Sequence, residues 1–382
     1  MSTYGQSSSP RIRDYAKERK ALLVDLRSDT ISRPSPAMKR AIAEAELGDD
    51  VWSEDPTVIK LEEKAAELLG KEAALFVSSG TMGNLISVLN HCDVRGSEAY
   101  CGEDSHIVLH EQGGAAQIGG VTVCPLPNNV DGTFDLRKLE NKIKADRQHE
   151  PISKLVAVEN TINGKVVPQK WIDELAELAK KHHLKMHMDG ARLWNASVAS
   201  GLLASKIVEK FDSATFCLSK LGAPVGSVLC GNREFIAKAR RVRKVLGGGM
   251  RQVGILAAAG IVALDEIVPL LRDDHRRAFQ IAKTINDMNC NTFNVDLQTT
   301  HTNMVLIKVT SNDNYTALDF VNRLQTVKED VDDDRVVVRG LTLTPELARL
   351  VWYYEITDEM TDAAERKIKY VIREYQAKRN EK

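Results

Sequence analysis

Short apolar runs alternate with longer amphipathic stretches along the first two thirds of the chain, from about residue 25 to residue 246. Runs of four or five apolar residues are typical of buried strands, whereas apolar residues three and four apart are typical of helices. The alternation predicts an α/β fold in which helices cover a mainly parallel sheet. Expected helices cover 56–69 and 169–182, and expected strands cover 73–77, 155–158, 184–188, 214–218 and 227–230.

The pattern changes after three consecutive glycines at positions 247–249. A glycine inside a helix costs about 1 kcal/mol relative to alanine, so the cluster predicts a turn between a basic helix that starts near residue 232 and a second helix. After about residue 271 the pattern predicts a strand, a helix, two strands and a final helix, over 302–309, 315–327, 335–339, 349–356 and 361–378. We therefore expect a partly flexible segment over 1–24, a large domain over 25–270 and a smaller α+β domain over 271–382.

The composition indicates a folded protein that acts on small molecules. The chain has 382 residues, of which 43% are hydrophobic, and a formal net charge of −1. Its interspersed charges predict no basic surface for nucleic acid or for a membrane, and the longest apolar runs fall short of a membrane span. Six cysteines without a CxxC pair indicate reduced thiols. Residues 1–20 lack the apolar core of a secretory signal, so we expect a cytoplasmic protein.

Two polar residues stand where predicted strands end. Lys220 follows the apolar run 214–218 in SATFCLSKLGAPVGS, and Asp189 follows the run 184–188 in MDGARL. Ligands of open α/β sheets bind at the carboxyl ends of the strands. A lysine in a cleft can lose its water, which lowers its pKa from about 10.4 and makes it a nucleophile toward carbonyl carbon. Pyridoxal phosphate needs such an amine and an acid opposite its pyridine nitrogen, so the pair predicts this cofactor.

Asp189 has two interpretations. An isolated acid at a strand end is typically a turn residue or a helix N-cap. Opposite a pyridinium at about 4 Å, with an effective dielectric constant near 20, its carboxylate would contribute about 4 kcal/mol, or about three pKa units. Arg192, three residues later, is either a solvated helix arginine or a partner of the acid or of the cofactor's phenolic oxygen.

The segment SSGTMGN, residues 78–84, follows a predicted strand and opens an apolar helix. Small residues at a helix N-terminus let backbone N–H groups approach a phosphate, and Gly80 and Thr81 are the candidates. The pattern alone is weak evidence, because a strand, a glycine-rich turn and a helix follow one another in many α/β folds. No GK[ST] follows it and the chain contains no GxGxxG, so neither a Walker loop nor a dinucleotide-binding turn is indicated.

Eight motifs resemble, in order and spacing, those of the low-specificity L-threonine aldolases from about residue 24 to residue 266. They are DLRSDT (25–30), GDDVWSEDP (48–56), KEAALFVSSGTMGN (71–84), DSHI (104–107), ENT (159–161), DGARLWNAS (189–197), CLSK with APVGS (217–227) and LGGGMRQ (246–252). The C-terminal part is similar chiefly through ARLV around Arg349. Any one motif would be weak, but eight in sequence are specific.

The resemblance implies a fold type I pyridoxal phosphate enzyme. Such a carbon–carbon lyase cleaves L-threonine or L-allo-threonine to glycine and acetaldehyde through an external aldimine and a quinonoid carbanion. The resemblance implies that Lys220 forms the internal aldimine, that Asp189 lies under the pyridine nitrogen and that His106 stacks on the ring. It also implies a phosphate cradle at Gly80 and Thr81.

The same resemblance assigns further groups. Lys244 and Arg251 match basic residues that reach the cofactor phosphate of a neighbouring subunit, which implies a homo-oligomer, a dimer of dimers, with shared sites. Ser28 and Arg349 match the groups that hold the substrate carboxylate, an anion for which a bidentate guanidinium is well suited. His106, directly or through water, is the candidate base for the β-hydroxyl proton.

Two positions depart from the family pattern. Ile162 follows ENT where many relatives have a histidine, which leaves the preference between L-threonine and L-allo-threonine open. Leu221 follows Lys220 where a glycine is usual, and the loop is one residue shorter. Transamination, β-elimination and a cofactor-holding protein without catalysis are the alternative functions, and product analysis separates them. No metal site is expected, because the four-residue spacing of His183 and His187 does not bring side chains together when the second lies in a strand.

Overall fold

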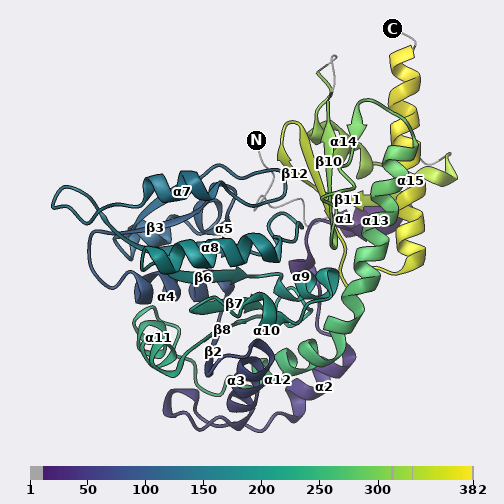
Figure 1. Ribbon diagram of the computed structural model, residues 1–382. Coiled ribbons are helices and arrows are strands. Elements are labelled where there is room, and N and C mark those ends of the chain that lie inside the picture. Colours follow the sequence, from purple (N-terminus) through teal and green to yellow (C-terminus); the bar gives the residue numbers. More distant parts are fainter. Residues whose placement is uncertain (1–11, 311–313, 329, 381–382) are drawn as a thin grey trace. The chain divides into compact units, whose positions relative to one another are not determined.

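The computed structural model describes residues 12–310, 314–328 and 330–380. The chain divides into two units, one formed by residues 33–269 and the other by residues 1–32 together with 270–382. Each unit has its own sheet and helices. Figure 1 shows the elements of both units with their labels.

The large unit is built on a seven-stranded sheet with the order β2-β8-β7-β6-β5-β3-β4. Every neighbouring pair is parallel except those made by β8, which runs antiparallel to β2 and β7. The predicted mainly parallel sheet is therefore confirmed. The strands are β2 (Ala73–Val77), β3 (Ser97–Gly102), β4 (Thr122–Leu126), β5 (Ile152–Glu159), β6 (Lys185–Gly190), β7 (Ser213–Cys217) and β8 (Ser227–Gly231).

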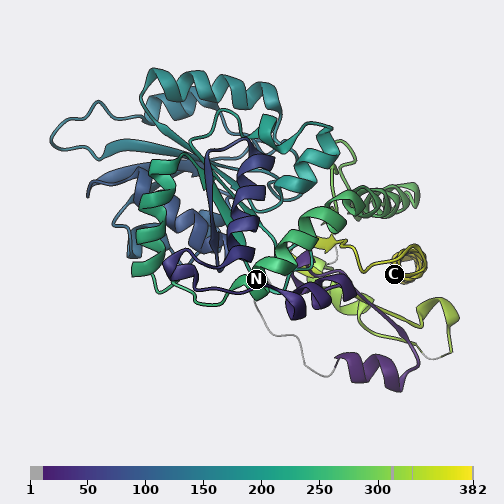
Figure 2. The same cartoon turned by 90° about the horizontal axis from the view of Figure 1, so that it is seen from below.

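Helices cover both faces of this sheet. Figures 1 and 2 show α8 (Gln169–Lys181) and α4 (Gly80–His91) on opposite faces. The other helices of the unit are α2 (Pro36–Glu44), α3 (Pro56–Leu69), α5 (His106–Leu109), α6 (Gly114–Gln117), α7 (Leu136–Lys142), α9 (Leu193–Ser200), α10 (Ala204–Ile207), α11 (Arg233–Val245) and α12 (Gly254–Val262).

Local sequence signals account for several helix ends. Asp55 caps α3 by accepting hydrogen bonds from the backbone N–H groups of Thr57 and Val58, as expected of an N-terminal acid. Gly70 ends the same helix with φ of 60°, a left-handed conformation that glycine adopts without a steric cost. Gly247 has φ of 79° between α11 and α12. The three glycines therefore form the predicted turn between two helices.

The smaller unit contains a segment from each end of the chain. β1 (Leu22–Asp25) pairs in parallel with β11 (Val336–Arg339), more than 300 residues later. Residues 25–32 were expected in the large domain, and that boundary is wrong because this pairing joins them to the C-terminal unit. Of residues 1–24, which were expected to be partly flexible, residues 12–24 include α1 (Ile12–Glu18) and most of β1; residues 1–11 lie outside the described part.

A four-stranded antiparallel sheet, β12-β13-β10-β9, and three long helices complete this unit. The predicted strand over 349–356 is correct only for residues 349–351, which end β13 (Leu347–Val351), and residues 352–356 are not in a strand. β13 forms a hairpin with β12 (Leu341–Thr344), and the sheet continues with β10 (Met304–Val309) and β9 (Phe293–Asn294). The helices are α13 (Leu271–Asp287), α14 (Ala317–Leu324) and α15 (Asp358–Asn380). Their apolar faces enclose a core that includes Phe293, Phe320 and Trp352.

One helical stretch, Gly254–Asp287, is long and apolar enough by length and composition to cross a membrane, and half of its apolar window is buried within the protein. The uninterrupted apolar runs within it are shorter, because Asp265 and Glu266 interrupt the stretch. A buried core helix can have the same length and composition as a membrane span.

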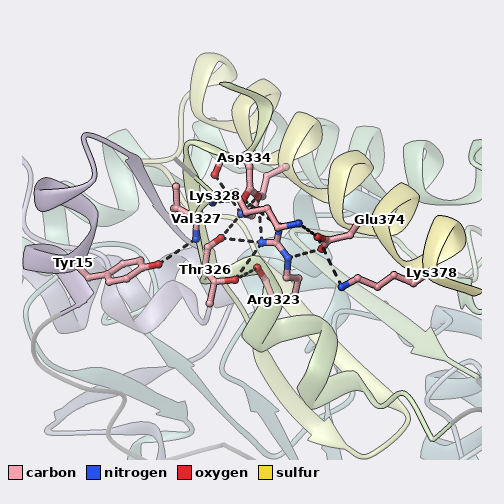
Figure 3. A network of polar contacts seen from close by, with 9 residues as sticks. Tyr15, Arg323, Thr326, Val327, Lys328, Asp334, Glu374 and Lys378 are labelled. Atoms are coloured by element: carbon pink, nitrogen blue, oxygen red, sulfur yellow. Dashed lines mark hydrogen bonds and ion pairs between the residues drawn. The ribbon is translucent and has the colours of Figure 1, made fainter. Parts of the chain in front are cut away.

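A buried polar network ties α14 and α15 to the segment before β11. Arg323 donates to both carboxylate oxygens of Asp334 at 3.2 and 3.1 Å and to Glu374 at 2.6 Å (Figure 3). Lys367, which is fully buried, donates to Asp334 and to the Thr326 carbonyl oxygen. Burial lowers the pKa of Lys367 to about 8, although Asp334 opposes the change. Asp334 is therefore the main counter-charge of Lys367.

Replacement of Asp334 with alanine is expected to lower the free energy of unfolding by about 3–5 kcal/mol, because it leaves the Lys367 ammonium buried without its counter-charge. Urea denaturation of the purified variant measures the loss. Asp332→Ala is the matched control, since the Asp332 side chain is fully exposed in its ion pair with Arg335. A loss below about 1 kcal/mol for Asp334→Ala would contradict the prediction.

Candidate active site

Four candidate groups lie at one edge of the large sheet. Asp189 is the last but one residue of β6, and Glu159 is the last residue of β5. Lys220 follows β7, and His106 follows β3. These strands are parallel, and the register pairs Glu159 with Asp189. Because the carboxyl ends of parallel strands meet at the same edge, the fold brings the predicted amine and acid to the edge where α/β proteins bind ligands.

Asp189 is held by donors on both carboxylate oxygens. Its side chain is 2% exposed. Oδ1 accepts a hydrogen bond from the Ala191 backbone N–H at 3.1 Å, and Oδ2 accepts one from Asn84 Nδ2 at 2.8 Å. The two donors fix the orientation of the carboxylate, so this arrangement suits an acid that faces a cationic donor.

His106 is oriented by a second acid. Its Nδ1 lies 2.9 Å from Glu111 Oε1, and its backbone N–H donates to Glu159 Oε2 at 2.7 Å. Burial lowers the pKa of His106, but the Glu111 hydrogen bond and the nearby Asp189 outweigh it and raise the pKa overall. Ligand atoms of His106, Glu111 and Asp189 lie within 4.8 Å of one another. Asn84 Nδ2 donates to both acids, so the three form part of a hydrogen-bonded cluster.

Burial raises the proton affinity of two acids in the site. Burial, together with the charge of Asp189, raises the pKa of Glu159 to about 8. Burial also raises the pKa of Glu111, with the His106 hydrogen bond opposing the change. Perturbed acids next to a lysine and a histidine are typical of catalytic sites.

Lys220 lies beside the N-terminus of α4. Its Nζ is 3.3 Å from Cys217 Sγ, and a Cβ on Gly80 would come within 2.9 Å of the same sulfur. Only glycine fits there, which keeps the backbone of Gly80 and Thr81 close to the lysine. Ser79 caps the helix through the Met82 N–H at 3.1 Å. A helix N-terminus with close backbone is suited to a phosphate.

Of the other basic candidates, Arg192 lies near the strand ends, two residues after β6, where it is the N-cap residue of α9 and its charge opposes the rise in the pKa of Glu159. Lys244 and Arg251 lie elsewhere. Lys244 lies in the last turn of α11, against Gly249. Arg251 forms an ion pair with Asp49 at 2.8 Å and its side chain is more than half exposed. Within the described part of a single chain, Lys244 and Arg251 therefore belong to the surface around the α11–α12 turn.

Ser28 and Arg349 belong to the smaller unit and lie near each other within it. Arg349, in β13, donates from Nη2 to the Arg27 carbonyl oxygen at 3.2 Å. Ser28 Oγ accepts hydrogen bonds from Thr30 Oγ1 at 2.8 Å and from its N–H at 3.3 Å. The fold thus joins a serine and an arginine that are 321 residues apart in the sequence.

The two departures from the family pattern occupy apolar positions. Ile162 is buried in a tight turn with Lys165, against Gly132. Leu221 is buried, and its N–H donates to the Leu218 carbonyl oxygen at 2.9 Å, which closes the short loop after β7.

Sequence reasoning missed Asn84, Glu111 and Glu159 as site residues. Asn84 and Glu159 lie inside motifs that the sequence analysis named. The available signal was the position of Asn84 near the start of α4 and that of Glu159 at the end of β5. Glu111 lies five residues after His106 in an irregular segment. Its role depends on a hydrogen bond that no periodic pattern predicts.

The donor set fits pyridoxal phosphate. An amine, a carboxylate held by donors, an imidazole and a helix N-terminus with an obligatory glycine meet at one sheet edge. These are the groups that the cofactor's aldehyde, ring nitrogen, ring face and phosphate require. The fold and the site therefore define a fold type I pyridoxal phosphate enzyme.

Comparisons with known proteins agree with this class. The beta-eliminating lyase family model matches residues 25–310. The probable low-specificity L-threonine aldolase 2 of Arabidopsis thaliana is 44% identical over 88% of this chain and 93% of its own. The low specificity L-threonine aldolase of Escherichia coli K12 is 47% identical over 75% and 85%. The chain belongs to the beta-eliminating lyase family, among the low-specificity L-threonine aldolases.

Solved structures show the same fold. The threonine aldolase of Leishmania major superposes with a TM-score of 0.75 at 21% identity, over 91% of this chain and 98% of that one. A serine palmitoyltransferase of Sphingomonas wittichii gives a TM-score of 0.70 at 16% identity, over 93% and 88%. At such identities the likeness supports the fold type and no more.

Proposed function

We propose that this enzyme cleaves L-threonine and L-allo-threonine to glycine and acetaldehyde. The observation that carries the proposal is the placement of Lys220 and Asp189 after adjacent parallel strands in a chain that is 44% identical to an L-threonine aldolase along most of its length. The side chain of Ile162 carries no polar group that could discriminate the two β-hydroxyl configurations.

In this proposal each group of the site has one task. Bound pyridoxal phosphate supplies an electron-withdrawing ring that stabilises negative charge on the substrate α-carbon. Lys220 Nζ would be the attachment point, Asp189 would face the ring nitrogen, and Arg192 would be the partner of the ring's phenolic oxygen. The N–H groups of Gly80 and Thr81 would hold the phosphate.

In this proposal His106 is the base that takes the β-hydroxyl proton. Its Nδ1–H donates to Glu111, so Nε2 keeps the lone pair that accepts the β-hydroxyl proton. The Cα–Cβ bond then breaks, acetaldehyde leaves, and the α-carbon takes up a proton to give glycine. A group that holds the substrate carboxylate would orient the Cα–Cβ bond for cleavage, and the family resemblance assigns this task to Arg349 and Ser28.

An acetaldehyde assay tests the function. Purified enzyme with pyridoxal phosphate and either L-threonine or L-allo-threonine should release acetaldehyde and glycine in equal amounts without any 2-oxo acid acceptor. Release of a 2-oxo acid without acetaldehyde would assign β-elimination instead, and a requirement for an acceptor would assign transamination.

The pH profile tests the pair of His106 and Glu111. Glu111→Gln removes the negative charge that raises the pKa of His106, so the histidine should lose its proton at lower pH. The acidic limb of kcat should therefore move to lower pH, while the maximal rate falls about 10-fold because the base is weaker. Glu103→Gln, at an exposed position nearby, is the control and should leave the limb in place. An unmoved limb in Glu111→Gln would contradict the assignment.

The proposal includes a cytoplasmic homotetramer, a dimer of dimers, that acts in threonine catabolism and glycine formation. Support comes from apolar side chains exposed near the basic pair: Trp52 is 72% exposed and Val245 is 80% exposed. Exposed aromatic and aliphatic side chains of this size are typical of subunit interfaces. Lys244 and Arg251 would then reach the phosphate of a neighbouring subunit.

Hybrid enzymes test the shared site. Lys220→Ala and Arg251→Ala subunits are each expected to be inactive or nearly so. Mixed after dissociation and reassembly, they should regain up to about a quarter of wild-type activity, because some hybrid sites combine an intact Lys220 with an intact Arg251. Activity that stays at the level of the separate variants would show that each site uses one chain only.

A further inference from the structure

A continuous chain of buried hydrogen bonds reaches Asp189 from the far end of α4. His91 Nε2 lies 2.8 Å from Ser213 Oγ, and Ser213 Oγ lies 2.9 Å from His187 Nδ1. His187 Nε2 lies 3.0 Å from Asn84 Oδ1, and Asn84 Nδ2 donates to Asp189 Oδ2 at 2.8 Å. We refer to His91, Ser213, His187 and Asn84 as the relay.

The fold explains why these residues meet. His187 and Asp189 are two residues apart in β6, so their side chains point to the same face of the sheet. The register pairs His187 with Ser213 of β7. Asn84 and His91 lie seven residues apart on α4, two helical turns, on the side that packs against β6 and β7. No relay residue is more than 9% exposed.

The chemistry of the end groups determines the direction of every bond. Asp189 and Glu111 accept hydrogen bonds, so the NH₂ group of Asn84, which lies 2.8 Å from each, must face them. The amide oxygen therefore faces His187, whose Nε2 must carry the proton. When His187 is neutral, its Nδ1 accepts a hydrogen bond from the Ser213 hydroxyl. The oxygen of the same hydroxyl accepts a hydrogen bond from His91 Nε2–H.

Both imidazoles favour the neutral form that this direction needs. Burial lowers the pKa of His187 to about 3, and burial lowers that of His91 to about 4. All donors point one way along the relay, and the last of them points at Asp189.

Packing alone does not account for this arrangement. Four buried polar side chains cost free energy unless each is hydrogen-bonded, and apolar residues would fill the same space at less cost. Asp189 lies in a site with Glu111 and Glu159, where burial and like charges favour protonated acids. A donor in a fixed position, Asn84 Nδ2 at 2.8 Å, holds the Asp189 carboxylate in one orientation among these acids.

We propose that His187 is a positioning residue, supported by Ser213 and His91. It holds the Asn84 carboxamide with its N–H groups toward Asp189. In this orientation Asp189 would accept a hydrogen bond from the protonated ring nitrogen of the cofactor. The inference rests on the proposed role of Asp189. His187 acts through Asn84 and touches neither cofactor nor substrate.

A cofactor analogue without the ring nitrogen separates this role from a structural one. Absorbance measurements on the full-length enzyme give the dissociation constants of pyridoxal phosphate and of its 1-deaza analogue. The ratio of the analogue's constant to that of pyridoxal phosphate reports the contact of Asp189 with the ring nitrogen. His187→Leu is expected to reduce this preference for pyridoxal phosphate about 10-fold, a loss typical of an outer-shell residue. His187→Gln places an amide donor near the same position and should restore it to within about 3-fold.

Ser87→Ala is the matched control. Ser87 is fully buried on the same helix and donates to the Gly83 carbonyl oxygen at 2.9 Å, outside the relay, so its loss should leave the ratio unchanged. If His187→Leu does not fold, the same ratio is measured for Ser213→Ala and for Ser213→Thr. Ser213→Ala should lower the ratio, by less than His187→Leu would, and Ser213→Thr, which keeps the hydroxyl, should restore it.

The proposal is overturned if His187→Leu lowers thermal stability or the affinity for both cofactors equally while the ratio stays at the wild-type value. If Asp189→Asn lowers the ratio and the relay variants do not, the role of Asp189 stands and the relay fails. If the wild-type enzyme binds the two cofactors equally well, the assignment of Asp189 and the inference both fail.

Discussion

Replacement of Lys220 with alanine is expected to reduce the turnover of L-threonine by about three orders of magnitude or more. The lysine provides the covalent attachment of the cofactor, and no other amine lies at the strand ends described for β5, β6 and β7. The variant should also lose the visible absorbance of the attached cofactor. Both effects are measured on purified protein, by an acetaldehyde assay and by an absorbance spectrum.

Borohydride reduction and peptide mapping supply the decisive control. In the wild-type enzyme the reduced cofactor should be found on Lys220 alone. Lys210→Ala, which changes an exposed lysine on the segment before β7, should leave both the rate and the labelled peptide unchanged. A label on any other residue, or a Lys220→Ala enzyme that keeps its spectrum, would remove the basis of the mechanism.

Replacement of Asp189 with alanine should have the second largest effect, a loss of about 10²- to 10³-fold in kcat. At about 4 Å and an effective dielectric constant of 20, the carboxylate attracts a protonated ring nitrogen by about 4 kcal/mol. Only the part of this attraction that is made in the transition state alone lowers kcat when the carboxylate is removed. A cofactor methylated on the ring nitrogen carries a permanent positive charge, so it should recover part of the lost rate in the variant.

The comparison needs a folded control with an acid removed elsewhere. Asp173→Asn, on the exposed side of α8, should retain the wild-type rate with either cofactor. Turnover by Asp189→Ala within about 3-fold of the wild-type enzyme would show that Asp189 does not set the charge of the ring. In that case the acid would be a structural turn residue, which is the alternative that its position in the sequence allows.

The sequence by itself determined the class of fold and the two groups on which the chemistry rests. Alternating apolar runs and amphipathic stretches are local signals, and they located β2, β6, β7, β8, α3 and α8 to within a few residues. Asp189 lies in the last two residues of β6 and Lys220 lies three residues after β7, so their place at the sheet edge was readable without any long-range contact.

Only the tertiary structure decided which residues support those groups. Asn84 contacts Asp189 across 105 residues, and Ser213 contacts His91 across 122, so these bonds depend on how α4 packs on the sheet rather than on any periodic pattern. The pairing of β1 with β11 and the neighbouring positions of Arg27 and Arg349 likewise join the two ends of the chain. Hydrophobic periodicity shows which face of an element is buried, but it does not show which distant element covers that face.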